Sequence, residues 1–142
     1  MARTPIYQIP GKLNVEWDTD AKCVVDTWSS YSISLDEFKQ AILGRAVLYA
    51  KPRGAVGWIV DSSKATGAFT QEIQHFIGET LFPKFAEIGI KYFITIPPQN
   101  AVTSLTVKSF SRKAGPNGME LIEVQSIEAA VQFVTTGGKK AA

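Results

Sequence analysis

The feature that most constrains the fold of this chain is the run Val56-Gly57-Trp58-Ile59-Val60 near its middle. Each of these residues is apolar or glycine, so a β-strand formed here presents apolar side chains to both faces of its sheet. Such a strand is stable only where other elements cover both faces. The run therefore predicts a strand in the interior of a sheet within an α/β domain.

Helices are predicted on either side of this run, because capping residues precede apolar residues at helical spacing. Ser34 and Glu37 form a Ser-x-x-Glu capping box, in which each side chain satisfies a free backbone donor of the first helical turn. Three further capping residues stand before apolar stretches, namely Thr70, Asn100 and Ser126. The first three helices are expected to end near residues 52, 89 and 114.

The remaining strands are predicted from alternation of apolar and polar residues and from turn residues between the alternating runs. Leu13 to Trp17 alternates, Asp18-Thr19-Asp20 offers a turn, and Cys23 to Trp28 alternates again, which is typical of an antiparallel hairpin. Two further strands are expected over Ile90–Ile96 and Met119–Val124.

The order of these elements predicts the fold class. After the hairpin, helices and strands alternate, and strand-helix-strand steps favour parallel pairing with a right-handed crossover. We therefore expect a single α/β domain over residues 1–136, with a mixed central sheet, an N-terminal antiparallel hairpin and helices packed on the sheet. Residues 137–142 are rich in Gly, Lys and Ala and are expected to form a flexible tail.

Composition excludes several classes of protein. A length of 142 residues with 45% hydrophobic and 20% charged residues is ordinary for one folded domain, and a net charge of +2 does not indicate a nucleic-acid partner. Cys23 is the only cysteine, so an intramolecular disulfide and a cysteine-based zinc site are excluded. We expect neither a signal segment nor an integral membrane segment. We expect a cytoplasmic protein.

The best candidate binding residues follow the predicted strands. Ligands and partners of parallel sheets tend to bind at the carboxyl ends of the strands, where loops and helix N-termini meet. This rule selects a candidate rim made of Asp61, Ser62, Ser63, Lys64, Thr66, Thr70 and Asn100. Trp28 and Tyr31, which end and follow a strand, are candidates for an apolar pocket.

No residue set in the chain predicts catalysis. The segment from Asp61 to Gly67 lacks the Gly-x-x-x-x-Gly-Lys-Ser/Thr spacing of a phosphate loop, and no Gly-x-Ser-x-Gly elbow accompanies His75, the only histidine. The carboxylates are not clustered with metal-ligand spacing. We expect no catalytic residue, no metal and no cofactor. An enzyme that uses Asp61 or Lys64 is the third-ranked hypothesis.

The arrangement of Trp28, Ser34, the strand ending in Asp61 and a polar loop up to Thr70 resembles the SpoIIAA-like or STAS-like domains, in their uncharacterised bacterial branch. Studied relatives are anti-sigma-factor antagonists, and a serine in an Asp-Ser-Ser-Gly segment at a helix start is their phosphorylated switch. In this chain Asp61-Ser62-Ser63 is followed by Lys64 in place of the glycine, and it stands at the end of a predicted strand and not at a helix start. By that register the regulated position falls near Thr70–Glu72, so we expect no phosphoswitch at Ser62 or Ser63.

The resemblance and the absence of a catalytic set lead to one main hypothesis of function. It is a non-enzymatic regulatory or protein-interaction module, whose protein partner is not identified by the sequence. The sequence also leaves open whether the chain forms a homo-oligomer. The alternative is a carrier of a small apolar or lipid-like ligand, and its distinguishing feature would be an open apolar cavity.

Overall fold

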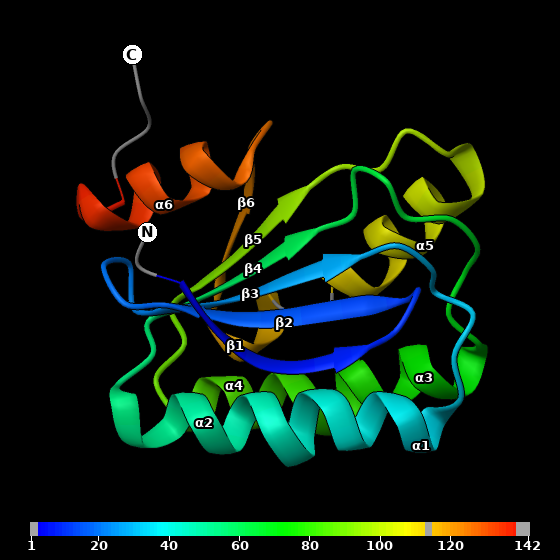
Figure 1. The fold of residues 1–142 in the computed structure, drawn as a ribbon, viewed down its shortest axis with the longest axis horizontal. Helices are drawn as coiled ribbons and strands as arrows, with labels where there is room; N and C mark the ends of the chain where they lie inside the picture. Colours follow the sequence, from blue (N-terminus) through cyan, green and yellow to red (C-terminus); the bar gives the residue numbers. More distant parts are fainter. Residues whose placement is uncertain (1–2, 113–114, 139–142) are drawn as a thin grey trace.

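The chain forms one mixed sheet of six strands, as seen in a computed structural model that describes residues 3–112 and 115–138 (Figure 1). The order of the strands in the sheet follows their order in the chain. The first two pairings are antiparallel and the other three are parallel. The strands are β1 (Arg3–Ile9), β2 (Leu13–Asp18), β3 (Cys23–Trp28), β4 (Gly57–Asp61), β5 (Tyr92–Ile96) and β6 (Glu120–Glu123).

The helices lie mainly in two connections between strands, where each helical stretch changes its hydrogen-bonding pattern along its length. Both stretches contain a π-helical segment, η1 between β3 and β4 and η3 between β4 and β5. In chain order the helical segments are α1 (Leu35–Phe38), η1 (Lys39–Val47), α2 (Leu48–Ala50), η2 (Lys51–Arg53), α3 (Gln71–Phe76), η3 (Ile77–Leu81), α4 (Phe82–Glu87), α5 (Ala101–Ser111), η4 (Gly115–Asn117) and α6 (Ile127–Thr135).

These helices cover both faces of the sheet, which gives the domain two apolar cores. The stretches from α1 to α2 and from α3 to α4 lie together under one face, and α6 lies on the other (Figure 1). On β4, Trp58 and Val60 belong to the first core, and Ile59 belongs to the second. The prediction that this strand is interior and covered on both faces is confirmed.

The predicted helix starts are confirmed as well. Ser34 and Glu37 form the full capping box, with both bonds 3.1 Å long. Thr70 Oγ1, Asn100 Oδ1 and Ser126 Oγ accept hydrogen bonds of 3.1 Å from the backbone N–H three residues further along. The hairpin over residues 13–28 is the antiparallel pair β2 and β3.

The sequence patterns did not predict β1, the strand at one edge of the sheet. Its alternation is weak and it contains Pro5, which cannot donate a ladder hydrogen bond. The edge position tolerates this residue, and the pairing with β2 shifts its register between Pro5 and Tyr7.

The predicted long helices are interrupted by η1 and η3, which the periodicity of apolar residues did not indicate. One break has a local cause. Pro83 is the second residue of α4, just after η3, and because proline has no backbone N–H, it cannot donate to the carbonyl of Glu79 as an α-helix requires. Within the ranges that the structure describes, no helix is both long and apolar enough to cross a membrane.

The C-terminal boundary is described only in part. The N–H groups of Gly137 and Gly138 donate to carbonyls of α6, at 3.1 Å and 2.8 Å. Residues 139–142 of the predicted tail lie outside the described residues, and so does Ala114, the predicted end of the third helix.

Gly57 provides a test of the packing between β3 and β4. A Cβ atom at this position would lie 2.7 Å from Sγ of the buried Cys23. We therefore expect Gly57→Ala to lower the free energy of unfolding by about 1–3 kcal/mol, the usual cost of an overpacked core. The measurement is urea unfolding of this variant beside Cys23→Ala and the double variant. Full additivity of the two single effects would contradict the predicted clash, because removing Sγ should relieve it.

Candidate functional site

The loop after β4 carries most of the predicted rim residues, and its start is held by hydrogen bonds. Asp61 Oδ1 accepts from the backbone N–H of Ser63 at 3.0 Å and from its Oγ at 2.7 Å. The side chains of Asp61 and Ser63 are half-buried, and Lys64 is exposed. Asp61 therefore shapes the turn that leaves the strand.

Ser62 is fully buried. Its hydroxyl shares a hydrogen bond with the phenol of Tyr31, and its N–H donates to the carbonyl of Ile96 at 3.1 Å. Ser62 is one of the predicted rim residues, but its side chain points into the domain, and its two hydrogen bonds hold the loop against Tyr31 and β5. A ligand or partner on the surface does not reach its hydroxyl.

The middle of the loop is fastened to the segment that follows β3. Thr66 N–H donates to the carbonyl of Ser29 at 3.2 Å, and Tyr31 N–H donates to the carbonyl of Thr66 at 2.9 Å. The side chain of Thr66 stays exposed. The exposed side chain of Thr66 therefore stands on a backbone that two hydrogen bonds hold in place.

The loop is also joined to the start of α5. Thr103, buried in the first turns of that helix, donates from Oγ1 to the carbonyl of Gly67 at 2.6 Å. Thr70 caps α3 and Asn100 caps α5, so both residues stand at helix N-termini beside this contact. The structure therefore places the exposed predicted rim residues on one side of the domain.

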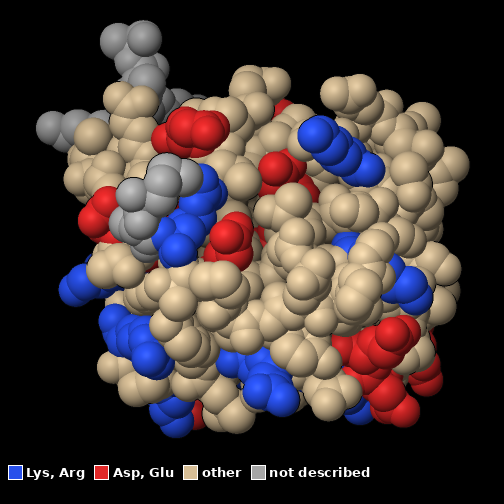
Figure 2. All heavy atoms as spheres, viewed as in Figure 1, with Lys and Arg blue, Asp and Glu red and all other residues tan. Residues whose placement is uncertain are grey.

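Two exposed apolar side chains on α5 were not singled out in the sequence. Val102 is 60% exposed and Leu105 is 71% exposed, and they are three residues apart on the helix. The segments 62–71 and 97–111 contain Lys64 and Lys108 as their only charged residues. In Figure 2 the upper right of the molecule, where α5 begins, is correspondingly mostly uncharged. We define the rim surface as the exposed residues Lys64, Thr66, Thr70, Asn100, Val102 and Leu105.

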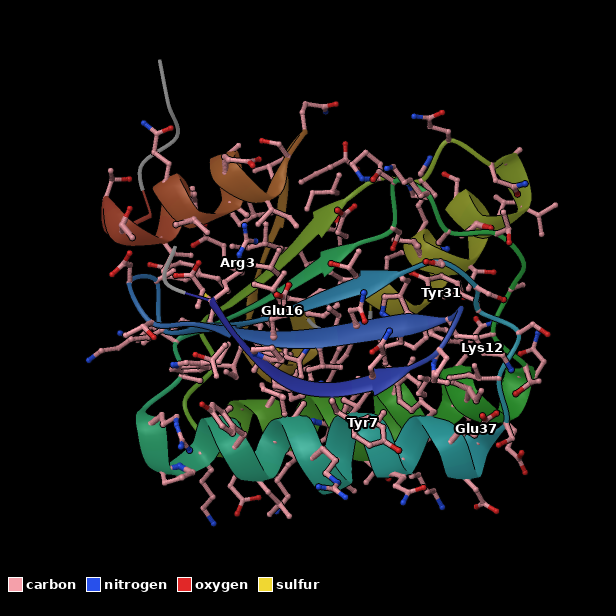
Figure 3. The ribbon with its side chains drawn as sticks, in the orientation of Figure 1. Arg3, Tyr7, Lys12, Glu16, Tyr31 and Glu37 are labelled. Carbon is pink, nitrogen blue, oxygen red and sulfur yellow. The ribbon has the colours of Figure 1, made fainter. Side chains whose placement is uncertain are left out.

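The aromatic pair predicted as a pocket lies inside the domain. Trp28 and Tyr31 contact each other edge to face with ring centroids 5.0 Å apart, and Tyr31 stacks on Phe69 at 4.1 Å. Figure 3 shows Tyr31 on the segment between β3 and α1. The same view shows Lys12 near Glu37 at the start of α1, and their charged groups are 3.9 Å apart. Burial raises the pKa of the Tyr31 phenol above its ordinary value.

A cavity of about 30 Å³ lies between the sheet and the layer of α1, η1, η3 and α4. Trp28 is one of its lining residues, and Asp26 is its only charged one. Asp26 is buried, and its Oδ2 accepts a hydrogen bond of 2.8 Å from Nε1 of Trp58. Asp26 is not among the site residues predicted from the sequence. Its neighbours Val24 and Trp28, two residues away on either side, place it on the same apolar face of β3.

The thiol of Cys23 is withdrawn from solvent. Burial, reinforced by nearby Asp18, raises the pKa of the Cys23 thiol to about 12, so the thiol stays protonated at neutral pH. No group of three or more His, Cys, Asp or Glu side chains in the described part of the chain has the arrangement of a metal site.

The position of the two loop serines leads to a prediction about phosphorylation. Ser62 Oγ is buried, and a phosphate on Ser63 would stand against the Asp61 carboxylate. We expect mass spectrometry of protein from the native cell to find no stoichiometric phosphate on either serine. Thr70, which is exposed at the start of α3, is the expected acceptor if one is modified. Stoichiometric phosphate on Ser62 or Ser63 would refute the prediction.

Comparison of this chain with protein-family models, with curated proteins and with solved structures gives no match.

Proposed function

We propose that this domain is a non-enzymatic regulatory module that binds another protein through its rim surface. Its α/β fold, with a mixed sheet that begins with an antiparallel hairpin, is compatible with the resemblance to STAS-like domains. The proposal places the contact at the carboxyl ends of β4 and β5, which is the edge where α/β sheets present their loops.

The observation that carries the proposal is the exposure of Val102 and Leu105 on α5. They lie beside the loop after β4, which is hydrogen-bonded to the same helix through Gly67. Exposed apolar groups that lie together, rimmed by polar residues, are typical of interaction sites. Charge is also sparse here, and the centres of protein interfaces are depleted of charged residues. Because the loop is hydrogen-bonded to the segment after β3 and to α5, little ordering entropy opposes binding.

The charges at the edge of the surface indicate the chemistry of the partner. Lys64 and Lys108 are exposed. The segments 62–71, between Asp61 and Glu72, and 97–111, around Asn100, contain no acidic residue. The partner should therefore present apolar side chains flanked by carboxylates, since opposite charges at an interface rim favour the encounter of the two proteins.

The test exchanges the two apolar side chains of α5 for acidic ones. We expect Val102→Glu with Leu105→Glu to abolish capture of the partner from native lysate, because the new carboxylates would have to be desolvated and would repel an acidic surface. Stability should change little, since both side chains face solvent. The measurement is quantitative affinity capture, with the thermal midpoint recorded beside it.

Leu48 supplies a matched control, because it is 65% exposed but lies on α2. Leu48→Glu should capture the same proteins as the wild-type domain. Unchanged capture by the α5 double variant, or equal loss with Leu48→Glu, would contradict the proposal. Capture of a second copy of this chain alone would identify a homo-oligomer instead.

The alternative function, transport of a lipid-like ligand, has less support. Sites for small molecules usually enclose roughly 300–1,000 Å³. The apolar cavity under the helices measures about 30 Å³. The larger hollows, of about 350 to 600 Å³, are lined in part by polar and charged residues, which do not suit an apolar ligand. A lipid-like ligand would have to displace the layer of α1 to α4 from the sheet.

A further inference from the structure

The buried carboxyl group of Asp26 has one oxygen with no hydrogen-bond partner. Oδ2 accepts from Trp58, but Oδ1 is shielded from solvent and finds no donor or acceptor among residues 3–112 and 115–138. Buried polar atoms in native proteins nearly always have a partner, so an orphan of this kind requires an explanation.

The cavity beside Asp26 offers space for such a partner. Its lining is apolar or aromatic apart from Asp26. The wall on the helix side includes Ile42 from η1 and Ile77 and Leu81 from η3. The remaining lining residues are Trp28, Phe38, Trp58, Val60, Phe69, Phe82, Phe85 and Phe93.

The chemistry of the missing partner follows from the two protonation states of the carboxyl group. Burial raises the pKa of Asp26 to about 7, with the Trp58 hydrogen bond opposing the rise. When the group is protonated, Oδ2 accepts from Trp58 and the proton resides on Oδ1, which then needs an acceptor. When it is ionised, Oδ1 needs a donor. A hydroxyl group serves in both states, since it can donate and accept.

Water fits this environment poorly. A buried water molecule typically makes about three hydrogen bonds. Among the lining side chains, the polar groups are the carboxyl of Asp26 and the indole N–H groups of Trp28 and Trp58, and the Trp58 N–H already donates to Asp26. The hydroxyl of an alcohol donates one hydrogen bond where water donates two. The carbon atoms of the alcohol contact the aromatic walls favourably. Since one water-sized group needs roughly 10–15 Å³, a cavity of about 30 Å³ accepts two or three heavy atoms.

Entry into the cavity would require the helices over it to move. Both η1 and η3 contribute to its wall, and π-helical turns are rare and frequently found at functional sites. A shift of one residue between π and α hydrogen bonding turns the helix face, and it would move Ile42, Ile77 or Leu81 relative to the sheet.

We propose that this cavity is a binding site for a neutral short-chain alcohol of two or three heavy atoms, whose hydroxyl group bonds Oδ1 of Asp26. The site lies inside the domain and does not depend on the rim surface or on its partner.

The indole N–H of Trp58 reports on the site directly, because it donates to the other oxygen of the same carboxyl group. The experiment titrates the ¹⁵N-labelled protein with ethanol and follows this resonance, which is identified by its loss in Trp58→Phe. We expect a saturable shift with ethanol. tert-Butanol, which also carries a hydroxyl but exceeds the cavity, should give no saturable shift. A shift that is linear in ethanol, absent, or equally saturable with tert-butanol would overturn the proposal.

Two variants test the role of the carboxyl group. Asp26→Asn keeps an acceptor for Trp58 and a group that can bond a hydroxyl, so it should retain ethanol binding. Asp26→Leu removes both, and we expect binding to weaken at least tenfold. Saturable ethanol binding of wild-type strength in Asp26→Leu would overturn the proposal. If this variant does not fold, the comparison of ethanol with tert-butanol in the wild-type protein decides alone.

Discussion

Raising the pH from about 4 to about 8 is expected to lower the free energy of unfolding by roughly 4 kcal/mol through Asp26 alone. Burial raises the pKa of this group from 3.8 to about 7 in the folded protein. Each unit of difference between the folded and unfolded states corresponds to about 1.4 kcal/mol. Below pH 3.8 both states are protonated and the stability is fully present. It is lost as the pH rises towards 7, because the unfolded chain releases its proton first.

The measurement is urea unfolding of wild-type protein and Asp26→Asn over this pH range. The difference between the two free energies isolates the Asp26 contribution, since the other titrating groups are common to both proteins. We expect that difference to change by several kcal/mol in favour of the variant as the pH rises. Parallel pH profiles would show that Asp26 ionises in the folded protein as readily as in the unfolded chain, and would contradict its placement in an apolar core.

Replacing Ile59 by Ala is expected to lower the free energy of unfolding by roughly 2–5 kcal/mol, the usual range for a buried large-to-small change. Ile59 is fully buried in the core under α6 and pairs with Val25 on one side and Ile94 on the other. Rigid strands on both sides leave little room for the cavity to collapse.

Leu48→Ala is the control for this change, because Leu48 is largely exposed and its truncation should cost less than about 0.5 kcal/mol. Both variants are compared with the wild type in denaturant titration. A loss below about 1 kcal/mol for Ile59→Ala would contradict the central place of β4.

Much of the fold could be predicted because its signals are local. The capping bond at Ser34 joins it to Glu37, only three residues away, and those at Thr70 and Ser126 likewise involve the third residue further along. The two-sided apolar run of β4 requires no knowledge of its neighbours. These features can be recognised in one short window of sequence.

The features that escaped prediction depend on distant parts of the chain. β1 is held by its pairing with β2 and carries little periodicity of its own. Val102 and Leu105 continue the apolar pattern of α5, and only the folded structure shows that they stay exposed among the described residues.

The candidate site shows the same limit. The rule of strand ends selected the loop after β4 as a candidate site, but it did not separate Ser62 from the exposed residues around it. The alternation of side chains along β4 could have separated it, since Ser62 follows Trp58 and Val60 at a spacing of two residues and so faces the same core. The same period of two places Asp26 between Val24 and Trp28 on a buried face, yet a single polar residue in a strand is more often taken as solvent-facing.

The most direct test of the rim surface is photo-cross-linking in the native cell, with a photoreactive amino acid introduced at Leu105 or, as the control, at the similarly exposed Leu48. The measurement is the mass of the adducts and the identity of the protein in them. We predict one dominant adduct from position 105, with a partner whose cross-linked segment is apolar and acidic, and no such adduct from position 48. Equal adducts from both positions, or none from position 105, would contradict the account.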